Sequence, residues 1–305
     1  MSTESPQFSL VAGEASGDLL AGLLLDGMHQ RWPQMQASGI GGARMAERGF
    51  KAWWPSDKLS VFGYIDALRH YREILGIRNQ LKSKLLANPP DIFIGVDAPD
   101  FNLDLEADLR QTGIKTVHFV CPSIWAWRPK RVEKLKKSCD HVLCVFPFEP
   151  EILAKHGIPA TFVGHPLASV IPMQPDKAKA RELLGLHLED KVVAVLPGSR
   201  LAELKHLAPR YFKAVAGVLI AFPAMKFIVP SMPKHIPLLQ QIAKDCGVEN
   251  QVQIISGQSH TALEACDVTL ITSGTATLEA ALYKRPMVIG YALTRSGDSR
   301  NNNGG

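Results

Sequence analysis

Two aspartates in the stretch "GVDAPDFN", residues 95–102, have the types and spacing that acid–base chemistry needs. The stretch follows a short apolar run that predicts a buried strand, so Asp97 is expected at the carboxyl end of that strand. Pro99 stiffens the turn and keeps Asp97 from joining the next helix directly. A carboxylate held there can act as a general base if burial raises its pKa toward neutrality. We therefore predict Asp97 as a catalytic base, and Asp100 as either an acceptor-side group or a cap of the next helix.

A second loop, "AGEASGD" at residues 12–18, combines glycines with acids. Glycines let a ligand approach the backbone without meeting a Cβ. Glu14 would repel a diphosphate, so the loop is better suited to a sugar hydroxyl or an incoming acceptor. We expect Glu14 and Ser16 on the acceptor side of a site; alternatively, Ser16 and Asp18 cap the following helix.

Two later loops have the opposite character and suit an anion. "LPGSRLAELK" at 196–205 and "TSGTATLEAAL" at 272–282 each join a predicted strand to a helix through small residues. Free backbone N–H groups at the start of a helix, together with an arginine, bind phosphate groups, and a carboxylate one turn further can accept ribose hydroxyls. The residues predicted to bind a nucleoside diphosphate are Ser199, Arg200, Ser273, Gly274, Thr275 and Glu279.

Aromatic and basic residues come together in "CPSIWAWRPKRVEKLKK", residues 121–137. Tryptophan faces stack on sugar rings and arginine neutralises phosphate. The alternative is a solvated charged helix anchored by two tryptophans. Nucleic-acid binding through this stretch is disfavoured, because acidic loops are expected at the same site.

The elements that must position these loops alternate along the chain. Short β-branched runs are separated by longer amphipathic stretches, which predicts an α/β protein with parallel sheets covered on both faces. Predicted strands are Phe8–Val11, Asp91–Val96, Thr116–Val120, His141–Val145, Thr161–Val163, Val192–Leu196, Phe227–Val229, Gln253–Ile255, Val268–Ile271 and Met287–Ile289. Proline recurs where the pattern lapses, which indicates a hinge. We expect an N-terminal domain at 1–165, a linker at 166–180, a C-terminal domain at 181–295 that is incomplete, and a disordered tail at 296–305.

Composition narrows the class of protein. The chain has 305 residues, of which 46% are hydrophobic and 21% charged, with a net charge of +5, as in globular proteins that bind anions or membrane surfaces. Its five cysteines are scattered, which predicts a reducing cytoplasm with neither disulfides nor a zinc site. No secretory signal is visible, and no apolar run reaches the roughly 18–20 residues of a membrane-spanning helix. Membrane contact is thus expected to be peripheral.

A helix predicted within residues 61–84 is the segment best suited to such contact. An apolar face flanked by basic residues can lie on anionic lipid, although apolar stripes at this spacing more often belong to a core. The predicted docking residues are Ile65, Leu68, Arg69, Tyr71, Arg72 and Ile74.

Taken in order, "SLVAGEASGD", "GVDAPDFN", "PSIWAWRPKR", "FVGHPL", "LPGSRLAEL" and "TSGTATLEAAL" resemble the motifs of bacterial lipid-A-disaccharide synthases. The resemblance implies two Rossmann-like domains that face a cleft, the glycosyltransferase B fold. It implies an inverting, metal-free transfer that joins UDP-2,3-diacylglucosamine to 2,3-diacylglucosamine 1-phosphate and releases UDP, with the UDP-sugar as a substrate and no cofactor. It also implies a cytoplasmic enzyme peripheral to the inner membrane of a Gram-negative bacterium.

By motif, Asp97 corresponds to the proposed base, Glu14 and Ser16 to the acceptor side, Ser199 and Arg200 to the diphosphate site, and Thr275 and Glu279 to the UDP site. The family continues for a C-terminal stretch that in some members exchanges between subunits, so a homodimer is expected if that stretch is present. Two alternatives remain: another UDP-sugar enzyme of this fold, such as an epimerase or a transferase with a soluble acceptor, and a non-catalytic UDP- or lipid-binding fragment.

Overall fold

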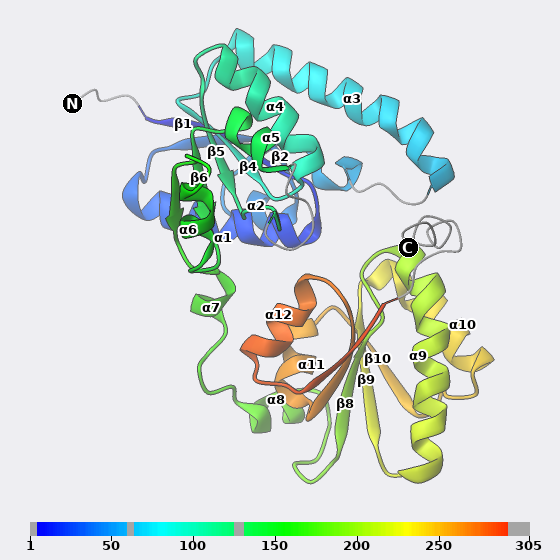
Figure 1. Cartoon of the computed structure of the whole chain (residues 1–305). Coiled ribbons are helices and arrows are strands. Elements are labelled where there is room, and N and C mark those ends of the chain that lie inside the picture. The colour runs from blue at the N-terminus through cyan, green and yellow to red at the C-terminus, as the bar shows by residue number, and fades with distance from the viewer. Residues whose placement is uncertain (1–4, 60–63, 125–130, 292–305) are drawn as a thin grey trace, which may run out of the picture. The chain divides into compact units, whose positions relative to one another are not determined.

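The computed structural model describes residues 5–59, 64–124 and 131–291, apart from the side chains of Ala15 and residues 64–71. Its contacts divide the chain into two units, Met1–Ser169 and Val170–Gly305, with the division inside the linker expected at 166–180. Every strand pair among these described residues is parallel, as the uninterrupted apolar runs predict. Each unit is an α/β domain built around one sheet (Figure 1).

Within the described residues, the first unit has a seven-stranded sheet in the order β3-β2-β1-β4-β5-β6-β7. Its elements are β1 (Gln7–Ala12), α1 (Ala15–Arg31), β2 (Gln36–Gly41), α2 (Ala43–Ala46), β3 (Lys51–Pro55), η1 (Ser56–Leu59), α3 (Tyr64–Ala87), β4 (Ile92–Val96), α4 (Pro99–Gln111), β5 (Lys115–Phe119), α5 (Arg131–Ser138), β6 (His141–Cys144), α6 (Glu149–Ala154), β7 (Ala160–Phe162) and α7 (Leu167–Val170), which lies at the boundary. Helices α3, α4 and α5 cover one face of the sheet, and α1 and α2 the other (Figure 1).

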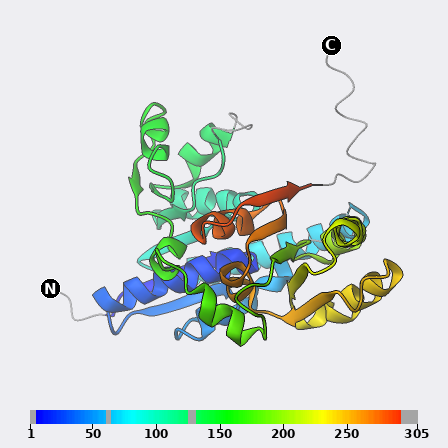
Figure 2. The same ribbon diagram turned by 90° about the horizontal axis from the view of Figure 1, so that it is seen from below.

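The second unit has a five-stranded sheet among its described residues, in the order β10-β9-β8-β11-β12. Its elements are α8 (Lys177–Leu183), β8 (Val192–Leu196), α9 (Leu201–Ala221), β9 (Lys226–Ser231), η2 (Pro233–His235), α10 (Ile236–Asp245), β10 (Val252–Ser256), α11 (Ser259–Ala265), β11 (Val268–Thr272), α12 (Thr275–Leu282) and β12 (Met287–Gly290). Both ribbon views place α10 beside α9 on one face of this sheet (Figure 1, Figure 2).

Buried apolar side chains pack each sheet against its helices. In the first unit a buried cluster joins Phe93 and Val11 of the sheet to Leu81 of α3 and Leu105 of α4. In the second unit Phe212 of α9 belongs to a cluster that also includes residues of α10 and of strands β8 to β10. Each Å2 of apolar surface that folding buries contributes about 25 cal/mol, so these clusters are the main favourable term in the free energy of folding. They hold the carboxyl ends of the strands, where the predicted loops begin, in fixed positions.

Two strands, β2 and β3, were not among those predicted from the sequence. The β2 sequence QASGIG is rich in small and polar residues, which disfavour strands in isolation. Parallel pairing with β1 nevertheless places Ser38 and Gly39 in the sheet. Tertiary pairing has overridden local propensity there.

Candidate functional site

The strand order places the two acidic loops next to each other. In the first unit the order reverses between β1 and β4, and ligands of open parallel sheets bind at such a reversal, beyond the carboxyl ends of the strands. Gly13 follows β1 and Asp97 follows β4. A Cβ added to Gly13 would lie 3.0 Å from the Cβ of Ala98, so the two loops are in close contact. The sequence therefore brings Glu14 and Asp97 to one edge of the sheet.

The backbone at Asp97 is held on both sides. Asp97 is half-buried, and its N–H donates to the carbonyl of Phe119 at the end of β5, at 2.9 Å. Its own carbonyl accepts from Nδ2 of Asn102 at 2.8 Å. Asp97 and Ala98 have φ values of 50° and 44°, in the left-handed region, and α4 begins at Pro99. Asp97 thus stays outside the helix, as predicted, and these hydrogen bonds hold its turn in the left-handed region.

The other acidic residues of these loops differ in their surroundings. Glu14 occupies the N-cap position of α1, although its side chain does not cap the helix, and Ser16 lies in the first turn. Asp18 is buried and accepts the N–H groups of Gly42 at 2.7 Å and Arg44 at 2.9 Å, so it stabilises the start of α2. The alternative that Asp18 caps its own helix is wrong.

Asp100 is exposed in the first turn of α4, and its carboxylate pairs with Arg131 at 2.6 Å. An acidic residue in that turn is favourable because it faces the positive end of the helix dipole. The environment of Asp100 is that of a surface ion pair between α4 and α5.

The predicted anion loops lie together in the second unit. There the strand order reverses between β8 and β11, and residues 197–200 follow β8 while Ser273 and Gly274 follow β11. Ser273 donates its N–H to the carbonyl of Gly290 at 3.1 Å, and Ser273, Gly274 and Thr275 are all exposed. The N-termini of α9 and α12 therefore meet at one edge of the sheet, where their dipoles favour an anion.

One expectation about the β8 loop is wrong. The N–H groups of Ser199 and Arg200 are not free, because Oε2 of Glu203 accepts them at 3.1 and 3.3 Å. Gly198 has a φ of 126°, and a Cβ there would overlap the Glu203 side chain, so glycine is needed for this closure. Arg200 lies 3.6 Å from the same carboxylate. An anion that binds this loop must share its donors with Glu203.

Glu279 lies one turn into α12, with 15% of its side chain exposed. Its carboxylate is 3.4 Å from Nε2 of His260, whose ring packs edge-on against Tyr283. Burial raises the pKa of Tyr283 to about 12, with further contributions from Glu264 and Glu279. The carboxylate of Glu279 is therefore only partly exposed and lies beside His260.

Two buried residues near these loops were missed from the sequence. Tyr211 of α9 approaches Thr272 at the end of β11, with its hydroxyl 3.3 Å from Oγ1, and also bonds to the backbone of Gly290. His235 bonds to the backbone of Ser199, while burial and nearby Lys234 lower its pKa. Neither belongs to a recognisable motif, so only the fold reveals their part in holding the loops.

The segment predicted to contact sugars or phosphate is partly outside the described residues. This applies to Trp125 and Trp127, while α5 follows at Arg131. Lys134 of α5 pairs with Asp104 of α4 at 2.6 Å. At least part of the basic stretch is therefore engaged with α4.

The proposed docking helix, α3, is anchored along its C-terminal half. Arg78 pairs with Asp104 and Lys82 with Asp108 on α4, both at 2.9 Å, and Ile74 packs against the core cluster. For Ile74 the interpretation as a core residue is thus the better one.

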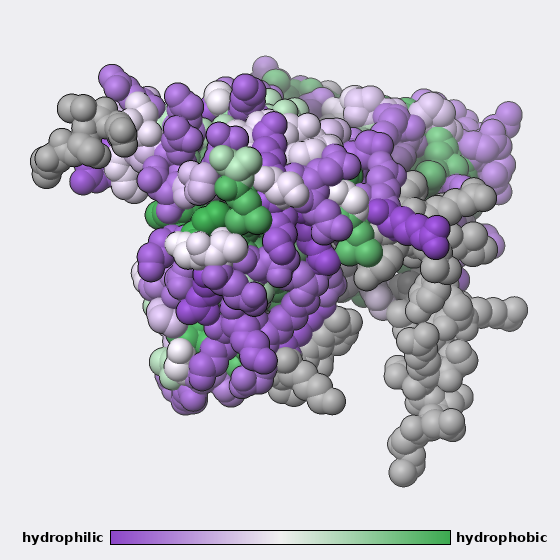
Figure 3. Space-filling view, turned by 90° about the horizontal axis from the view of Figure 1, so that it is seen from above, coloured by the Kyte–Doolittle hydropathy of each residue, from purple (hydrophilic) through white to green (hydrophobic). Residues whose placement is uncertain are grey.

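Arg72 of α3 is exposed. The side chains of Ile65, Leu68, Arg69 and Tyr71 lie outside the described residues. Seen from above, the visible face is mostly hydrophilic with small separate apolar areas (Figure 3). None of the described helices has the length and apolar content that crossing a membrane requires.

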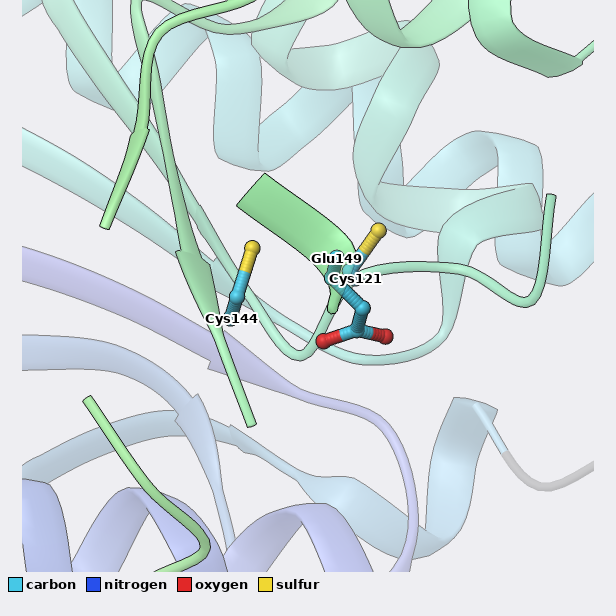
Figure 4. Close-up of side chains that lie close together, drawn as sticks. All are labelled: Cys121, Cys144 and Glu149. Carbon is cyan, nitrogen blue, oxygen red and sulfur yellow. The ribbon is translucent and has the colours of Figure 1, made fainter. Parts of the chain in front are cut away.

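One group of potential metal ligands occurs among the described residues, namely Cys121, Cys144 and Glu149, all buried (Figure 4). Its chemistry does not fit a metal well. A hydrogen bond to Cys144 and burial raise the pKa of the Cys121 thiol, so the metal-binding thiolate is disfavoured. Oε2 of Glu149 already accepts the N–H groups of Val145 and Phe146 at 3.1 and 3.0 Å. The group is best explained as packing at the start of α6.

Comparison with known proteins identifies relatives across most of the chain. The family model described as lipid-A-disaccharide synthetase matches residues 8–295. The lipid-A-disaccharide synthase of Albidiferax ferrireducens is 65% identical over 288 residues, which cover 94% of this chain and 74% of that protein. The synthase of Verminephrobacter eiseniae is 59% identical with the same coverage.

Solved structures show the same fold at low sequence identity. The UDP-GlcNAc 2-epimerase of Neisseria meningitidis bound to UDP-GlcNAc matches with a TM-score of 0.65 at 12% identity, over 97% of this chain and 85% of that one. The UDP-GlcNAc 2-epimerase of Methanocaldococcus jannaschii with UDP-GlcNAc and UDP matches with a TM-score of 0.63 at 13% identity, over 93% and 83%. Each domain is thus a Rossmann-like half of the glycosyltransferase B fold.

Proposed function

This chain belongs to the lipid-A-disaccharide synthetase family, whose model matches residues 8–295, and from that membership we propose that Asp97 is the base of its glycosyl transfer. The family's activity is the formation of the lipid A disaccharide, a hexosyl transfer. The proposed donor is UDP-2,3-diacylglucosamine and the proposed acceptor is 2,3-diacylglucosamine 1-phosphate. The single observation that supports the role of Asp97 is its placement at the reversal point of the first sheet, in a turn fixed by neighbouring elements.

The proposed reaction is a direct displacement. The 6-hydroxyl oxygen of the acceptor attacks C1 of the donor sugar, and Asp97 takes the hydroxyl proton. The bond from C1 to the diphosphate oxygen breaks, and its electron pair leaves with UDP. Because attack and departure occur on opposite faces, the anomeric centre inverts. A positioned carboxylate contributes about 10²- to 10⁴-fold to such a step.

We also propose that UDP binds at the second unit's reversal point. The exposed Ser273, Gly274 and Thr275 at the start of α12, together with Arg200, are suited to the diphosphate, and Glu279 to the ribose. Donors and helix dipoles that face the growing charge lower the barrier for departure of UDP. On this account the transfer needs no metal ion, and addition of EDTA should leave the rate unchanged; a rate restored only by Mg²⁺ would contradict it.

Membrane docking is proposed for the part of α3 before Ile74. Both substrates are acylated, and the pattern of Ile65, Leu68 and Tyr71 with Arg69 and Arg72 suits an anionic lipid surface. The ion pairs of Arg78 and Lys82 support restricting the proposed contact to that part. The enzyme is thereby proposed to be peripheral to the inner membrane.

The experiment is to incubate the protein with the two acylated sugars and follow UDP release together with the disaccharide. Asp97→Asn should reduce transfer at least about 100-fold while UDP binding is retained, because only proton removal is lost. Asp108→Asn is the matched control, since Asp108 is a surface carboxylate of the same unit paired with Lys82. Transfer by Asp97→Asn at the rate of the control would refute the assignment.

A further inference from the structure

Three polar side chains are fully buried beneath the Asp97 turn. Asn102 and Glu106 lie one turn apart on α4, and His118 lies on β5; each has 0% of its surface exposed. Nδ1 of His118 is 2.7 Å from Oε1 of Glu106. Polar groups are rarely buried so completely unless they are fully paired.

These three residues are not fully paired. Within the part of the chain that the structure describes, the buried side-chain atoms without a hydrogen-bond partner are Oδ1 of Asn102, Oε2 of Glu106 and Nε2 of His118. Each such atom loses its hydration on folding without compensation. An apolar core would be more stable, so the group needs an explanation other than stability.

Asn102 connects the group to both acidic loops. Its Nδ2 donates to the carbonyl of Asp97 at 2.8 Å, and it lies 3.3 Å from the carbonyl of Val11 at the end of β1 and 3.4 Å from that of Val96. The side-chain amide of Asn102 therefore connects the carboxyl ends of β1 and β4, at the point where the strand order reverses. The left-handed backbone of Asp97 and Ala98 is unfavourable for residues with a Cβ and persists only where its surroundings enforce it.

The absence of a side chain at Gly95 leaves room for the side chains of Asn102 and Glu106 against the sheet. Gly95 pairs with His118 in the register between β4 and β5. A Cβ at Gly95 would overlap Oε1 of Glu106 and would lie 2.9 Å from the Cβ of Asn102. The glycine is thus required by the two α4 side chains and not by a turn.

We propose that Asn102, Glu106 and His118 are positioning residues that hold Asp97 toward the acceptor hydroxyl. Asn102 fixes the backbone of Asp97, and the His118–Glu106 pair keeps a proton beneath the Asp97 turn. The inference rests on the proposed role of Asp97. It explains why unpaired polar atoms gather under this one turn.

The charges around the pair agree with this role. Burial alone would lower the pKa of His118, but the carboxylate of Glu106 and, more weakly, that of Asp97 raise it. Burial raises the pKa of Glu106. Among the described residues, the thiol of Cys139, which follows α5, also lies near Glu106 and bonds to the backbone of His118, and burial raises its pKa. Both shifts of the pair, that of His118 and that of Glu106, favour the form in which the pair holds its proton.

The test compares Asn102→Ala, Asn102→Ser and His118→Gln with Thr116→Val. Thr116 is a matched control because it is a buried polar residue on the same strand, but its hydroxyl bonds to Ser138 and not to the loop. A displaced base should lower kcat about 10- to 100-fold in the Asn102 variants while KM for the UDP-sugar changes less than about twofold. His118→Gln should shift the acidic limb of the kcat profile to higher pH, because a positive charge near Asp97 is lost.

Two outcomes overturn the inference. One is a folded Asn102 or His118 variant with the kcat and pH profile of Thr116→Val. The other needs no variant and so does not depend on folding: if NMR shows that His118 of the wild-type protein titrates at or below its ordinary pKa of 6.5, the pair does not retain its proton. If Asp97→Asn is fully active, the proposed role of Asp97 as the base fails; if Asp97→Asn is inactive while these variants behave as the control, only this inference fails.

Discussion

The carboxylate of Glu203 accepts a hydrogen bond from the backbone N–H of Ser199 at 3.1 Å. This N–H group belongs to the loop proposed to bind diphosphate. The same carboxylate also accepts the N–H of Arg200 and pairs with the guanidinium of that residue. The Glu203 carboxylate thereby caps the first turn of α9, as the N3 glutamate of a capping box does. It also places a negative charge beside the position of the incoming anion.

Glu203→Gln should therefore bind UDP more tightly. The amide oxygen can still accept the two N–H groups, while the like charge is removed, which is worth on the order of 1 kcal/mol or about fivefold in affinity. Isothermal titration calorimetry with UDP measures the change. Glu249→Gln is the control, because Glu249 is an exposed acid before β10, at the opposite end of the strands.

An unchanged or weaker affinity in folded Glu203→Gln would show that the diphosphate does not meet this carboxylate. Glu203→Ala separates the two roles of the side chain. It removes the cap as well as the charge and should cost about 1 kcal/mol in the free energy of unfolding.

The placement of the site loops at the carboxyl edge of each sheet could be predicted from the sequence, because it follows from parallel pairing of the strands. Apolar runs such as Val192–Leu196 mark central parallel strands, and loops after such strands share one edge of the sheet. What local pattern could not show was pairing at a distance. Glu203 closes its own loop and Asp18 caps a helix more than twenty residues away; both interactions depend on backbone positions that only the fold provides.

The buried group under Asp97 left one signal that could have been found. Asn102 and Glu106 are polar residues four positions apart on a helix face otherwise formed by leucines and phenylalanine. Such a break in an apolar stripe indicates a buried polar network. Its partner, His118, is on a different element, so spacing alone could not identify the pair.

Asp18→Asn should destabilise the first unit. The buried carboxylate accepts N–H groups at the start of α2, and hydrogen bonds to a charged acceptor contribute about 1.5–3 kcal/mol. An amide in its place loses the charge and can present N–H where an acceptor is needed. Thermal unfolding should show a lower Tm than that of Asp26→Asn, whose surface ion pair with Arg48 is worth at most about 1 kcal/mol. Equal Tm values for the two variants would contradict this account of α2.

The stability of the second unit should decrease at acidic pH because the carboxylate of Asp267 becomes protonated. Burial alone would raise the pKa of this carboxyl, but Lys177, the N–H of Val192 and the buried Arg181 together lower it. Its contribution is therefore present above the ordinary pKa of 3.8 and is lost as the pH falls through the lower folded value.

Urea unfolding from pH 7 to pH 3 measures this contribution. Asp267→Asn should lose about 2–3 kcal/mol at pH 7, because Arg181 is left without its charged partner, and should show a flatter dependence on pH below about 4. Asp245→Asn, an exposed acid bonded to Gln241, should follow the wild type. A parallel pH dependence in wild type and Asp267→Asn would exclude Asp267 as the source.

The proposed membrane contact predicts that two parts of α3 respond differently to serine. Ile74 packs against the core cluster, so Ile74→Ser should lower the free energy of unfolding by about 1–3 kcal/mol. The double variant Leu68→Ser, Tyr71→Ser should instead keep the wild-type Tm, because its changes lie in the half of α3 beyond the ion pairs to α4.

Sedimentation with vesicles that contain anionic lipid measures the membrane binding of these variants. The double variant should bind more weakly, since each side chain removed from the interface loses about 1.5–3 kcal/mol of burial. Arg72→Glu should weaken binding further at low salt and less at high salt, because screening reduces its attraction to anionic headgroups. Unfolding of the double variant would place Leu68 and Tyr71 in a core, and undiminished vesicle binding by a folded double variant would move the contact to another surface.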